Sequence, residues 1–251
     1  MDKTLVCTTY FSKKIHPNNP NDRWVVGKDS DGRVLQNNIK YIEPWYNSIN
    51  SLGIKGLVFY DNLTKEFINK YQNNNVTFHK VENSEYSNND WRFFVYRDFL
   101  KDKLYDSVFL TDGSDVIISQ DPAKIITEHP DIDFFICKDS IKLADFGYLA
   151  VHQQAGWENY SWFAMQCLQR KLDLINMGVI GGTYSNICQF LEVFCETRTK
   201  MASPNFNADM WVGQYVFRHL LKDKNIMLGE PFTSEFKKYQ TDRKDVYFIH
   251  K

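Results

Sequence analysis

The chain has 251 residues, of which 43% are hydrophobic and 24% are charged, and both values are typical of a globular protein. This length is enough for one large domain with a full core or for two small domains. The formal net charge is −1 and the lysines and arginines form no sustained stripe, so the charge gives no indication of a nucleic-acid-binding protein.

Signals for strands and helices alternate along the first half of the chain. Short apolar runs predict strands, whereas apolar residues at helical spacing behind a polar cap predict helices. In chain order we expect a strand at 4–10, a polar loop at 12–38, a helix at 45–52, a strand at 56–61, a helix that Asn62 caps and that ends at Tyr71, a strand at 76–81, and a helix at 91–103 that Asn89-Asp90 caps.

The same alternation continues through the second half. We expect a strand at 108–110, a short helix that begins at Asp121-Pro122 and ends before Pro130, a strand at 133–138, a helix at 157–171, a strand at 177–182, helices at about 185–200 and 208–222, and a last strand at 246–249. Such alternation predicts an α/β fold with a mostly parallel central sheet and helices on both faces. No segment has the composition of a linker, so a single domain is predicted.

The cysteines and the apolar segments indicate in which cellular compartment the protein is expected. The five cysteines show no zinc-binding spacing and stand among apolar neighbours, which predicts reduced, buried thiols. The first residues lack the apolar core of a secretory signal, and no stretch approaches the roughly 20 apolar residues of a membrane helix. We therefore expect a cytoplasmic protein without a transmembrane segment.

The segment 108–118 carries the strongest chemical signal. Asp112 and Asp115 stand between two apolar runs, and a buried strand rarely ends in two carboxylates. Two unpaired carboxylates repel each other, whereas a divalent cation keeps both ionised. The carboxyl end of a mid-chain strand is also where open α/β sheets bind ligands. We therefore predict a site for a metal ion and a diphosphate; the alternative is a simple turn around Gly113.

Three motifs resemble those of the GT-A glycosyltransferases and occur in that family's order. The first, at 109–116, is an apolar strand that ends in the two aspartates, with Asp-Pro shortly after it; the second, at 175–182, contains Asn-Met-Gly-Val; the third, at 207–211, is Asn-Ala-Asp-Met-Trp. The resemblance implies one Rossmann-like GT-A domain over residues 1–251. Its nucleotide-sugar-binding half would span about 1–120 and its acceptor-binding half about 121–251.

The resemblance implies a metal-dependent glycosyltransferase, either a hexosyl- or a pentosyltransferase. It would move a sugar from a nucleotide-diphosphate donor, expected to be a UDP-sugar, to a glycan, protein or lipid-linked acceptor. The implied cofactor is Mn²⁺ or Mg²⁺, and the implied metal ligands are Asp112, Asp115 and His250. Lys251 would pair with a phosphate oxygen. For His250, a surface histidine is the equally plain alternative.

The chain departs from the family pattern at two places. The usual acidic motif is Asp-x-Asp, whereas here two residues separate the aspartates, so a turn or bulge at Gly113 is needed to bring them together. Met210 stands where many members have a Gln. The first departure leaves open which aspartate binds the metal directly, and the second removes an amide from the acceptor side.

Further residues are implied to bind the donor. They are Thr8, Thr9 and Tyr10 after the first strand, Asp61 after the second, Arg92 and Arg97 on the helix before the acidic motif, Asp112 itself, and Gly178. The hydroxyls and the tyrosine ring suit a base and a ribose. The alternative for at least one of the two arginines is that it lies on the exposed surface of the helix. The alternative for Gly178 is that it only shapes the end of a strand.

Asp209 and Asn176 are the implied catalytic residues. In an inverting enzyme Asp209 would act as general base on the acceptor hydroxyl, and Asn176 would bond hydroxyls of the donor sugar. The alternatives are a carboxylate that is favourable at a helix N-terminus and an asparagine in a turn. Asn207 is the better capping residue for that helix, which favours a functional Asp209.

Two other functions stay open. A sugar nucleotidyltransferase shares the sheet, but it usually has a Gly-rich basic loop after the first strand, and Thr8-Thr-Tyr-Phe11 is neither. A non-catalytic nucleotide-sugar-binding protein on a GT-A fold is favoured by Met210 and the longer acidic motif, although both aspartates are present. The donor sugar, the acceptor, the stereochemical outcome and the oligomeric state do not follow from the sequence.

Overall fold

The computed structural model describes residues 3–14, 34–145, 162–163, 165–167, 170–201 and 203–251. Its elements, in chain order, are β1 (Thr4–Tyr10), η1 (Ile39–Tyr41), α1 (Glu43–Leu52), β2 (Lys55–Tyr60), α2 (Lys65–Tyr71), β3 (Val76–Lys80), α3 (Asn88–Leu100), β4 (Ser107–Thr111), β5 (Val116–Ile118), α4 (Ala123–Glu128), β6 (Phe134–Lys142), η2 (Leu143–Asp145), β7 (Asp173–Thr183), α7 (Tyr184–Lys200), α8 (Asp209–Tyr215), η4 (Val216–Leu220), β8 (Ile226–Leu228) and β9 (Phe248–His250).

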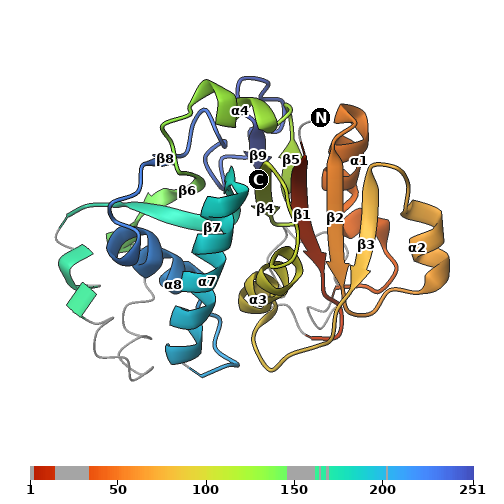
Figure 1. Ribbon diagram of the computed structural model, residues 1–251, viewed down its shortest axis with the longest axis horizontal. Coiled ribbons are helices and arrows are strands. Elements are labelled where there is room, and N and C mark those ends of the chain that lie inside the picture. Colours follow the sequence, from red (N-terminus) through yellow and green to blue (C-terminus); the bar gives the residue numbers. More distant parts are fainter. Residues whose placement is uncertain (1–2, 15–33, 146–161, 164, 168–169, 202) are drawn as a thin grey trace.

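The central sheet of the described residues has seven strands in the order β3-β2-β1-β4-β7-β6-β8 (Figure 1). Strands β3, β2, β1 and β4 run parallel, and so do β6 and β8, whereas β7 is antiparallel to both β4 and β6. The prediction of a mostly parallel α/β sheet is therefore confirmed. The predicted last strand is present as β9, but it lies outside this sheet and pairs with β5.

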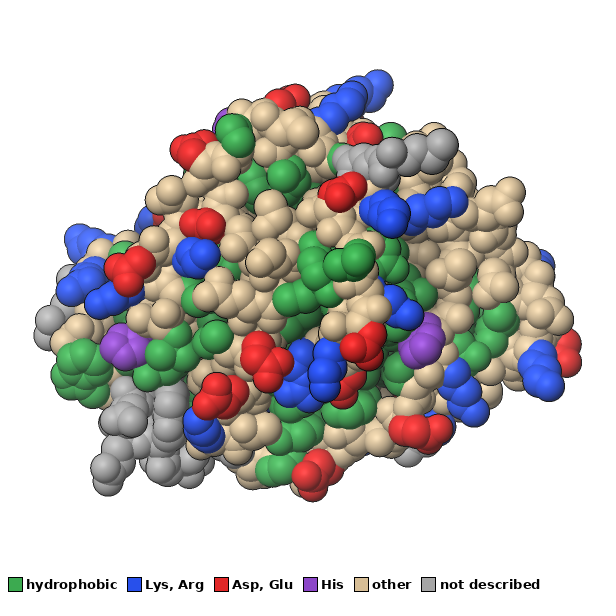
Figure 2. Space-filling view, in the orientation of Figure 1, with side chains coloured by type: hydrophobic (Ala, Val, Ile, Leu, Met, Phe, Trp, Pro, Cys, Tyr) green, Lys and Arg blue, Asp and Glu red, His purple; other side chains and the backbone are tan. Residues whose placement is uncertain are grey.

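Each face of the sheet has its own core, because side chains alternate along the strands. On β4, Val108 and Leu110 belong to a cluster that includes residues of α3, α7 and α8. Phe109 belongs to the opposite cluster, with Trp45 of α1 and Phe67 of α2. Helices therefore cover both faces, as predicted. Figure 2 shows the face with α3 and α7 in front, where acidic and basic side chains are interspersed.

Several helix boundaries differ from the predictions. Thr64 caps α2 through Phe67 N and Ser87 caps α3 through Asp90 N, in place of Asn62 and Asn89-Asp90. Both hydroxyl residues stand three positions before the amide they bind, which is the spacing that a side-chain cap needs.

The predicted helix at 157–171 lies largely outside the described residues. Residues 162–163 and 165–167 are helical, and the chain has left the helix by 170. The predicted helix at 208–222 is α8 followed by the single π turn η4. In the described part of the chain, no helix is long and apolar enough to cross a membrane. All five cysteines are free, and Cys188 alone is more than marginally exposed.

A buried ion pair fixes the segment that leads into α8. Arg198 of α7 is fully buried. It donates hydrogen bonds to the carbonyls of Met201, Ser203, Pro204 and Phe206 and pairs with the Asp90 carboxylate. Asp90 also accepts from the backbone N–H of Ala208, at 3.1 Å. Because these bonds hold the chain up to Ala208, they set the position of Asp209.

We predict that Arg198→Met lowers the free energy of unfolding by about 3–5 kcal/mol, because it leaves the Asp90 carboxylate buried without its cation. Urea denaturation followed by circular dichroism measures this change. Lys200→Met on the same helix is the control: its side chain is 64% exposed, and the expected change is within about 0.5 kcal/mol. A loss below about 1 kcal/mol for Arg198→Met would contradict the role given to this ion pair.

Candidate functional site

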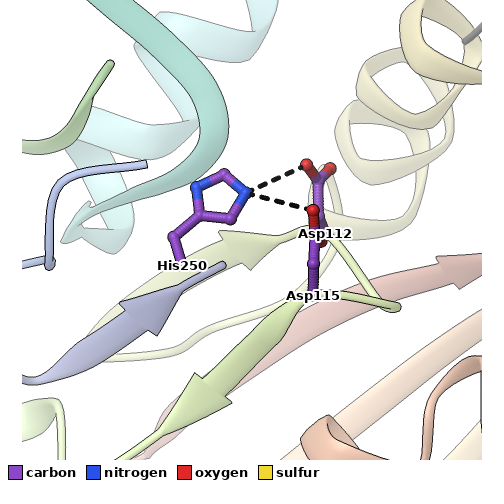
Figure 3. Close-up of side chains that lie close together, drawn as sticks. All are labelled: Asp112, Asp115 and His250. Atoms are coloured by element: carbon purple, nitrogen blue, oxygen red, sulfur yellow. Dashed lines mark ion pairs between the residues drawn. The ribbon is translucent and has the colours of Figure 1, made fainter. Parts of the chain in front are cut away.

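The loop between β4 and β5 brings the two aspartates to the end of the chain. After β4 the backbone bends through residues 113–115, as the turn predicted at Gly113 requires. Strand β5 then pairs with β9, with Val116 opposite His250, and Lys251 N donates to the Asp115 carbonyl at 2.9 Å. This pairing places His250 beside both aspartates (Figure 3).

The three side chains converge on one point. Nε2 of His250 lies 3.6 Å from Oδ2 of Asp112 and 3.6 Å from Oδ2 of Asp115, and one ligand atom from each residue lies within 4.8 Å of the others. Both distances are too long for hydrogen bonds. Two ligands about 2.1 Å from a shared ion are separated by about 3 to 4.2 Å, so a divalent cation fits between them.

The burial of the three side chains is consistent with a bound cation. The His250 side chain is fully buried, whereas the side chains of Asp112 and Asp115 are 30% and 15% exposed. Among the described residues, none accepts or donates a hydrogen bond at His250 Nε2. Its ion-pair partners, the two carboxylates, are 3.6 Å away, and a buried nitrogen that makes no hydrogen bond is costly unless something binds it. The residues present therefore fit the implied Mn²⁺ or Mg²⁺.

The charges around His250 favour a positive charge at this place. Burial by itself would lower the pKa of the ring, but Cys137 and the Asp115 carboxylate outweigh burial and raise that pKa to about 10. A proton on Nε2 and a metal ion at Nε2 exclude each other, so a bound cation takes the place of the proton.

An irregularity in β7 shapes the floor of the site. Ile136 of β6 pairs with Ile180, but the next residue, Cys137, pairs with Asn176, so residues 177–179 have no partner in β6. The Met177 carbonyl accepts from Arg92 Nη2 at 3.1 Å, and the Gly178 carbonyl accepts from the backbone N–H of Asp112 at 2.7 Å. The motif at 175–182 therefore supports the acidic loop directly.

Gly178 stands at the closest approach in the site. A Cβ at this position would lie 2.2 Å from His250 Cε1 and 2.6 Å from Asp112 Oδ2. Asn176 fixes this residue, since its Oδ1 accepts from Gly178 N at 2.8 Å and its Nδ2 donates to Asp139 at 3.3 Å. The structure thus brings Gly178 to the triad and places Asn176 behind it.

Arg92 connects the acidic loop with α8. Its guanidinium is buried and donates to Asp112 Oδ1 through Nη1 and to Asp209 Oδ2, at 3.1 Å, through Nη2. Burial and the nearby Asp90 raise the pKa of Asp209 to about 6, although Arg92 lowers it. Asp209 is the first residue of α8, whose cap residue is Ala208, without a side-chain hydrogen bond. Asn207 is therefore not the cap that we expected.

Other residues predicted to bind the donor have structural partners. The Tyr10 ring is fully buried and its hydroxyl donates to the carbonyl of Asn38, so it does not offer a face for stacking. Thr8 Oγ1 donates to the Thr111 carbonyl at 3.1 Å. The Asp61 carboxylate accepts from the backbone N–H groups of Ser12 and Lys13. It therefore shapes the loop after β1, while Thr9 is partly exposed beside it.

Arg97 is not brought to the site. Its guanidinium pairs with Asp98 at 2.8 Å, and both residues line a hollow between α3 and α7 with Tyr184 and Glu192 of α7. Met210 packs against the apolar cluster that α3, α7 and α8 share. Neither residue contributes a polar group to the triad.

Three residues around His250 were not expected from the sequence. Cys137 Sγ lies 3.3 Å from His250 Nδ1, Ser234 Oγ accepts from His250 N at 2.9 Å, and the Phe236 ring centroid is 4.2 Å from that of the imidazole. They come from two segments far apart in the sequence, β6 and residues 234–236, which meet His250 only in the folded protein, so no local pattern signals them.

Comparisons with known proteins agree with the fold. No family model matches the chain and no curated protein is similar to it in sequence. A solved glycosyltransferase involved in glycosylation of the major capsid of PBCV-1 is 14% identical, with 99% of this chain and 92% of that chain covered and a TM-score of 0.48. An active-site mutant of LgtC is 12% identical, with 98% and 86% covered and a TM-score of 0.53. The second similarity shows a GT-A fold, as the sequence motifs predict.

We predict that Gly178→Ala weakens Mn²⁺ binding by at least about tenfold, because the new methyl group separates His250 from Asp112. Titration of Mn²⁺ followed by the electron paramagnetic resonance signal of the free ion measures the affinity. Gly182→Ala in the same strand is the control, since its Cβ would meet the Asp133 carbonyl at 2.8 Å and the Ile187 side chain at 3.7 Å, both away from the triad. Equal Mn²⁺ affinity of Gly178→Ala and wild type would contradict this geometry.

Proposed function

We propose that the protein is a metal-dependent glycosyltransferase that moves a sugar from a nucleotide-diphosphate donor to an acceptor hydroxyl. One observation carries the proposal: Asp112, Asp115 and His250 place ligand atoms within 4.8 Å of one another, at the carboxyl end of the central strand β4 of a GT-A fold. The proposed donor is a UDP-sugar. The proposed acceptor is a glycan, a protein or a lipid-linked sugar, and the transferred group a hexose or a pentose.

The proposed metal ligands are Asp112, Asp115 and His250. When bound, Mn²⁺ or Mg²⁺ supplies positive charge that stabilises the nucleoside diphosphate as it leaves. Arg92 forms an ion pair with Asp112, and one guanidinium cannot balance two carboxylates, so the pair of aspartates favours a cation. Lys251, whose backbone binds Asp115, is proposed to pair with a phosphate oxygen.

Arg92 and Asp209 are proposed to bind and orient the sugars. The guanidinium binds Asp112 and Asp209 at once, so it holds the acceptor-side carboxylate at a fixed place relative to the metal ligands. A carboxylate with a pKa near 6 exchanges a proton readily near neutral pH, which suits a general base in an inverting reaction. Asn176 Nδ2 has a second hydrogen beyond its bond to Asp139, which is proposed for a donor-sugar hydroxyl.

An alternative from a different functional class is a protein that binds a nucleotide sugar without transferring it. Its support is Met210, an apolar side chain packed against the core at a position where the resemblance leads us to expect an amide. The two functions differ in turnover and not in binding, so a single experiment separates them.

We predict slow, Mn²⁺- or Mg²⁺-dependent hydrolysis of one nucleotide sugar from a panel of UDP- and GDP-sugars, because the leaving diphosphate needs the cation. Release of the nucleoside diphosphate, measured by a coupled assay with each metal and with chelator, identifies the donor. Asp115→Ala should lose at least about 100-fold in rate. Asp98→Ala removes an exposed carboxylate of α3 and should retain the wild-type rate.

The outcomes of this assay are distinct. Metal-dependent binding without turnover, tested with several acceptor sugars present, would favour the binding protein. No binding of any nucleotide sugar in the presence of metal would contradict the glycosyltransferase proposal. Equal rates for Asp115→Ala and wild type would place the metal elsewhere.

We predict that turnover falls as the pH decreases through about 6, because protonation of Asp209 removes the base and its ion pair with Arg92. This pKa lies above that of an unfolded aspartate, about 3.9, so Asp209 favours the folded state most below that value and loses this contribution as the pH rises through about 6. Protonation of Asp209 therefore does not unfold the protein, and the loss of rate in acid is not caused by unfolding through this residue. Rates measured from about pH 5 to about pH 8 should show the inflection in wild type and not in Asp209→Asn; a flat wild-type profile would contradict this role.

A further inference from the structure

The imidazole of His250 has two nitrogens with different surroundings. Nε2 faces the carboxylates of Asp112 and Asp115, whereas Nδ1 lies 3.3 Å from Sγ of Cys137. Cys137 is fully buried in β6. A histidine ligand needs a lone pair on the nitrogen that meets the metal, so the proton of the neutral ring must then be on the other nitrogen. The partner at Nδ1 therefore determines whether Nε2 is available.

The hydrogen bonds of Cys137 make its sulfur an acceptor toward His250. Its Sγ is 3.5 Å from the carbonyl oxygen of Lys138, to which only the thiol can donate. With the thiol hydrogen used on that carbonyl, the sulfur is left to accept a hydrogen bond from Nδ1–H of His250. A chain from His250 through Cys137 to the backbone thus holds one ring hydrogen on Nδ1, so the proton that a cation displaces is the one on Nε2.

The fold keeps this pair in contact. The register shift between β6 and β7 lies at Cys137, and the Cys137 side chain joins the cluster that also contains Phe232 and Phe248. Phe236 packs against the imidazole with the ring centroids 4.2 Å apart and the ring planes tilted by 36°, and Ser234 Oγ accepts from the backbone N–H of His250. The ring therefore has Phe236 and Gly178 as close neighbours, and the thiol contacts its Nδ1.

We propose that Cys137 is a positioning residue for the metal ligand His250, fixing the tautomer and the orientation in which Nε2 binds the cation. The inference rests on the metal site of the proposed function and adds a thiol in the place where metal-binding histidines usually have a carboxylate, a backbone carbonyl or water. The Cys137 thiol does not touch the cation or the sugar; it acts through His250 alone.

The test compares Mn²⁺ affinities of three variants with wild type, by titration against the electron paramagnetic resonance signal of free Mn²⁺. Cys137→Ala removes the partner of Nδ1 and should weaken binding by about 10- to 100-fold. Cys137→Ser keeps a group that both donates and accepts, and should restore the affinity to within about threefold. Cys195→Ala removes another fully buried cysteine, on α7, and should leave the affinity unchanged.

A second readout separates positioning from a general loss of packing. In protein labelled with ¹⁵N-histidine and saturated with Mn²⁺, pulsed electron paramagnetic resonance detects the coupling between the ion and a bound imidazole nitrogen. The coupling should be present in wild type, Cys137→Ser and Cys195→Ala, and lost or much reduced in Cys137→Ala. Thermal unfolding followed by circular dichroism confirms that each variant is folded.

The inference and the proposed function fail in different ways. If wild type binds Mn²⁺ with a nitrogen coupling and Cys137→Ala matches it in both, the role of Cys137 is wrong and the metal site stands. Cys137→Ser as weak as Cys137→Ala, with both folded, would also overturn the role of the thiol as a hydrogen-bond partner. If wild type binds no Mn²⁺, the metal site of the proposed function fails and the inference fails with it.

Discussion

The pairing of β5 with β9 is the contact on which the site depends. Asp112 and Asp115 are three residues apart on one loop, but His250 is more than a hundred residues further along the chain. Three residues of β9 align with three of β5, and the Lys251 backbone continues this contact to Asp115. Because the pairing is short, its register decides whether the imidazole faces the carboxylates, since a shift by one residue would turn the side chain to the other face.

The electrostatics of the site follow from this geometry. The buried guanidinium of Arg92 pairs with two carboxylates, those of Asp112 and Asp209, while the carboxylate of Asp115 lies 3.6 Å from Nε2 of His250. Against the effect of burial, Cys137 and the Asp115 carboxylate raise the pKa of the His250 ring, and the charge of the ring compensates part of the negative charge. A divalent cation is the more complete compensation, and the lack of any Cβ at Gly178 lets His250 and Asp112 approach closely enough to share it. The irregularity in β7 and the Arg198–Asp90 pair are the supports that hold these groups in place.

Much of the fold could be predicted from local signals. The first strand has the predicted bounds, Thr4–Tyr10, because apolar periodicity alone defines a buried strand. Asp112, Asp115 and the bend at Gly113 were visible because polar residues at the end of a buried strand are unusual. The caps at Thr64 and Ser87 were missed since several polar residues precede each helix, and the choice among them depends on where tertiary packing starts the first turn.

The limits of the prediction concern contacts between distant segments. Arg92 and Arg97 look equivalent in sequence, yet only Arg92 lies on the side of α3 that faces Asp112. Tyr10 and Asp61 carry groups suited to a ligand, but the fold uses them to close the loop after β1. Cys137 was predicted as a buried thiol and is one, but its contact with His250 arises from the register of β6, β7 and β9, which no local pattern specifies.

The central claim is that a divalent cation binds between Asp112, Asp115 and His250. Diffraction from crystals grown with MnCl₂ and a nucleoside diphosphate, measured at a wavelength where manganese scatters anomalously, tests it most directly. The account predicts an anomalous peak at about 2.1–2.3 Å from His250 Nε2 and from an oxygen of at least one of the two aspartates, with diphosphate oxygens completing the coordination. Manganese bound elsewhere, or no peak between these three side chains at a saturating concentration, would contradict it.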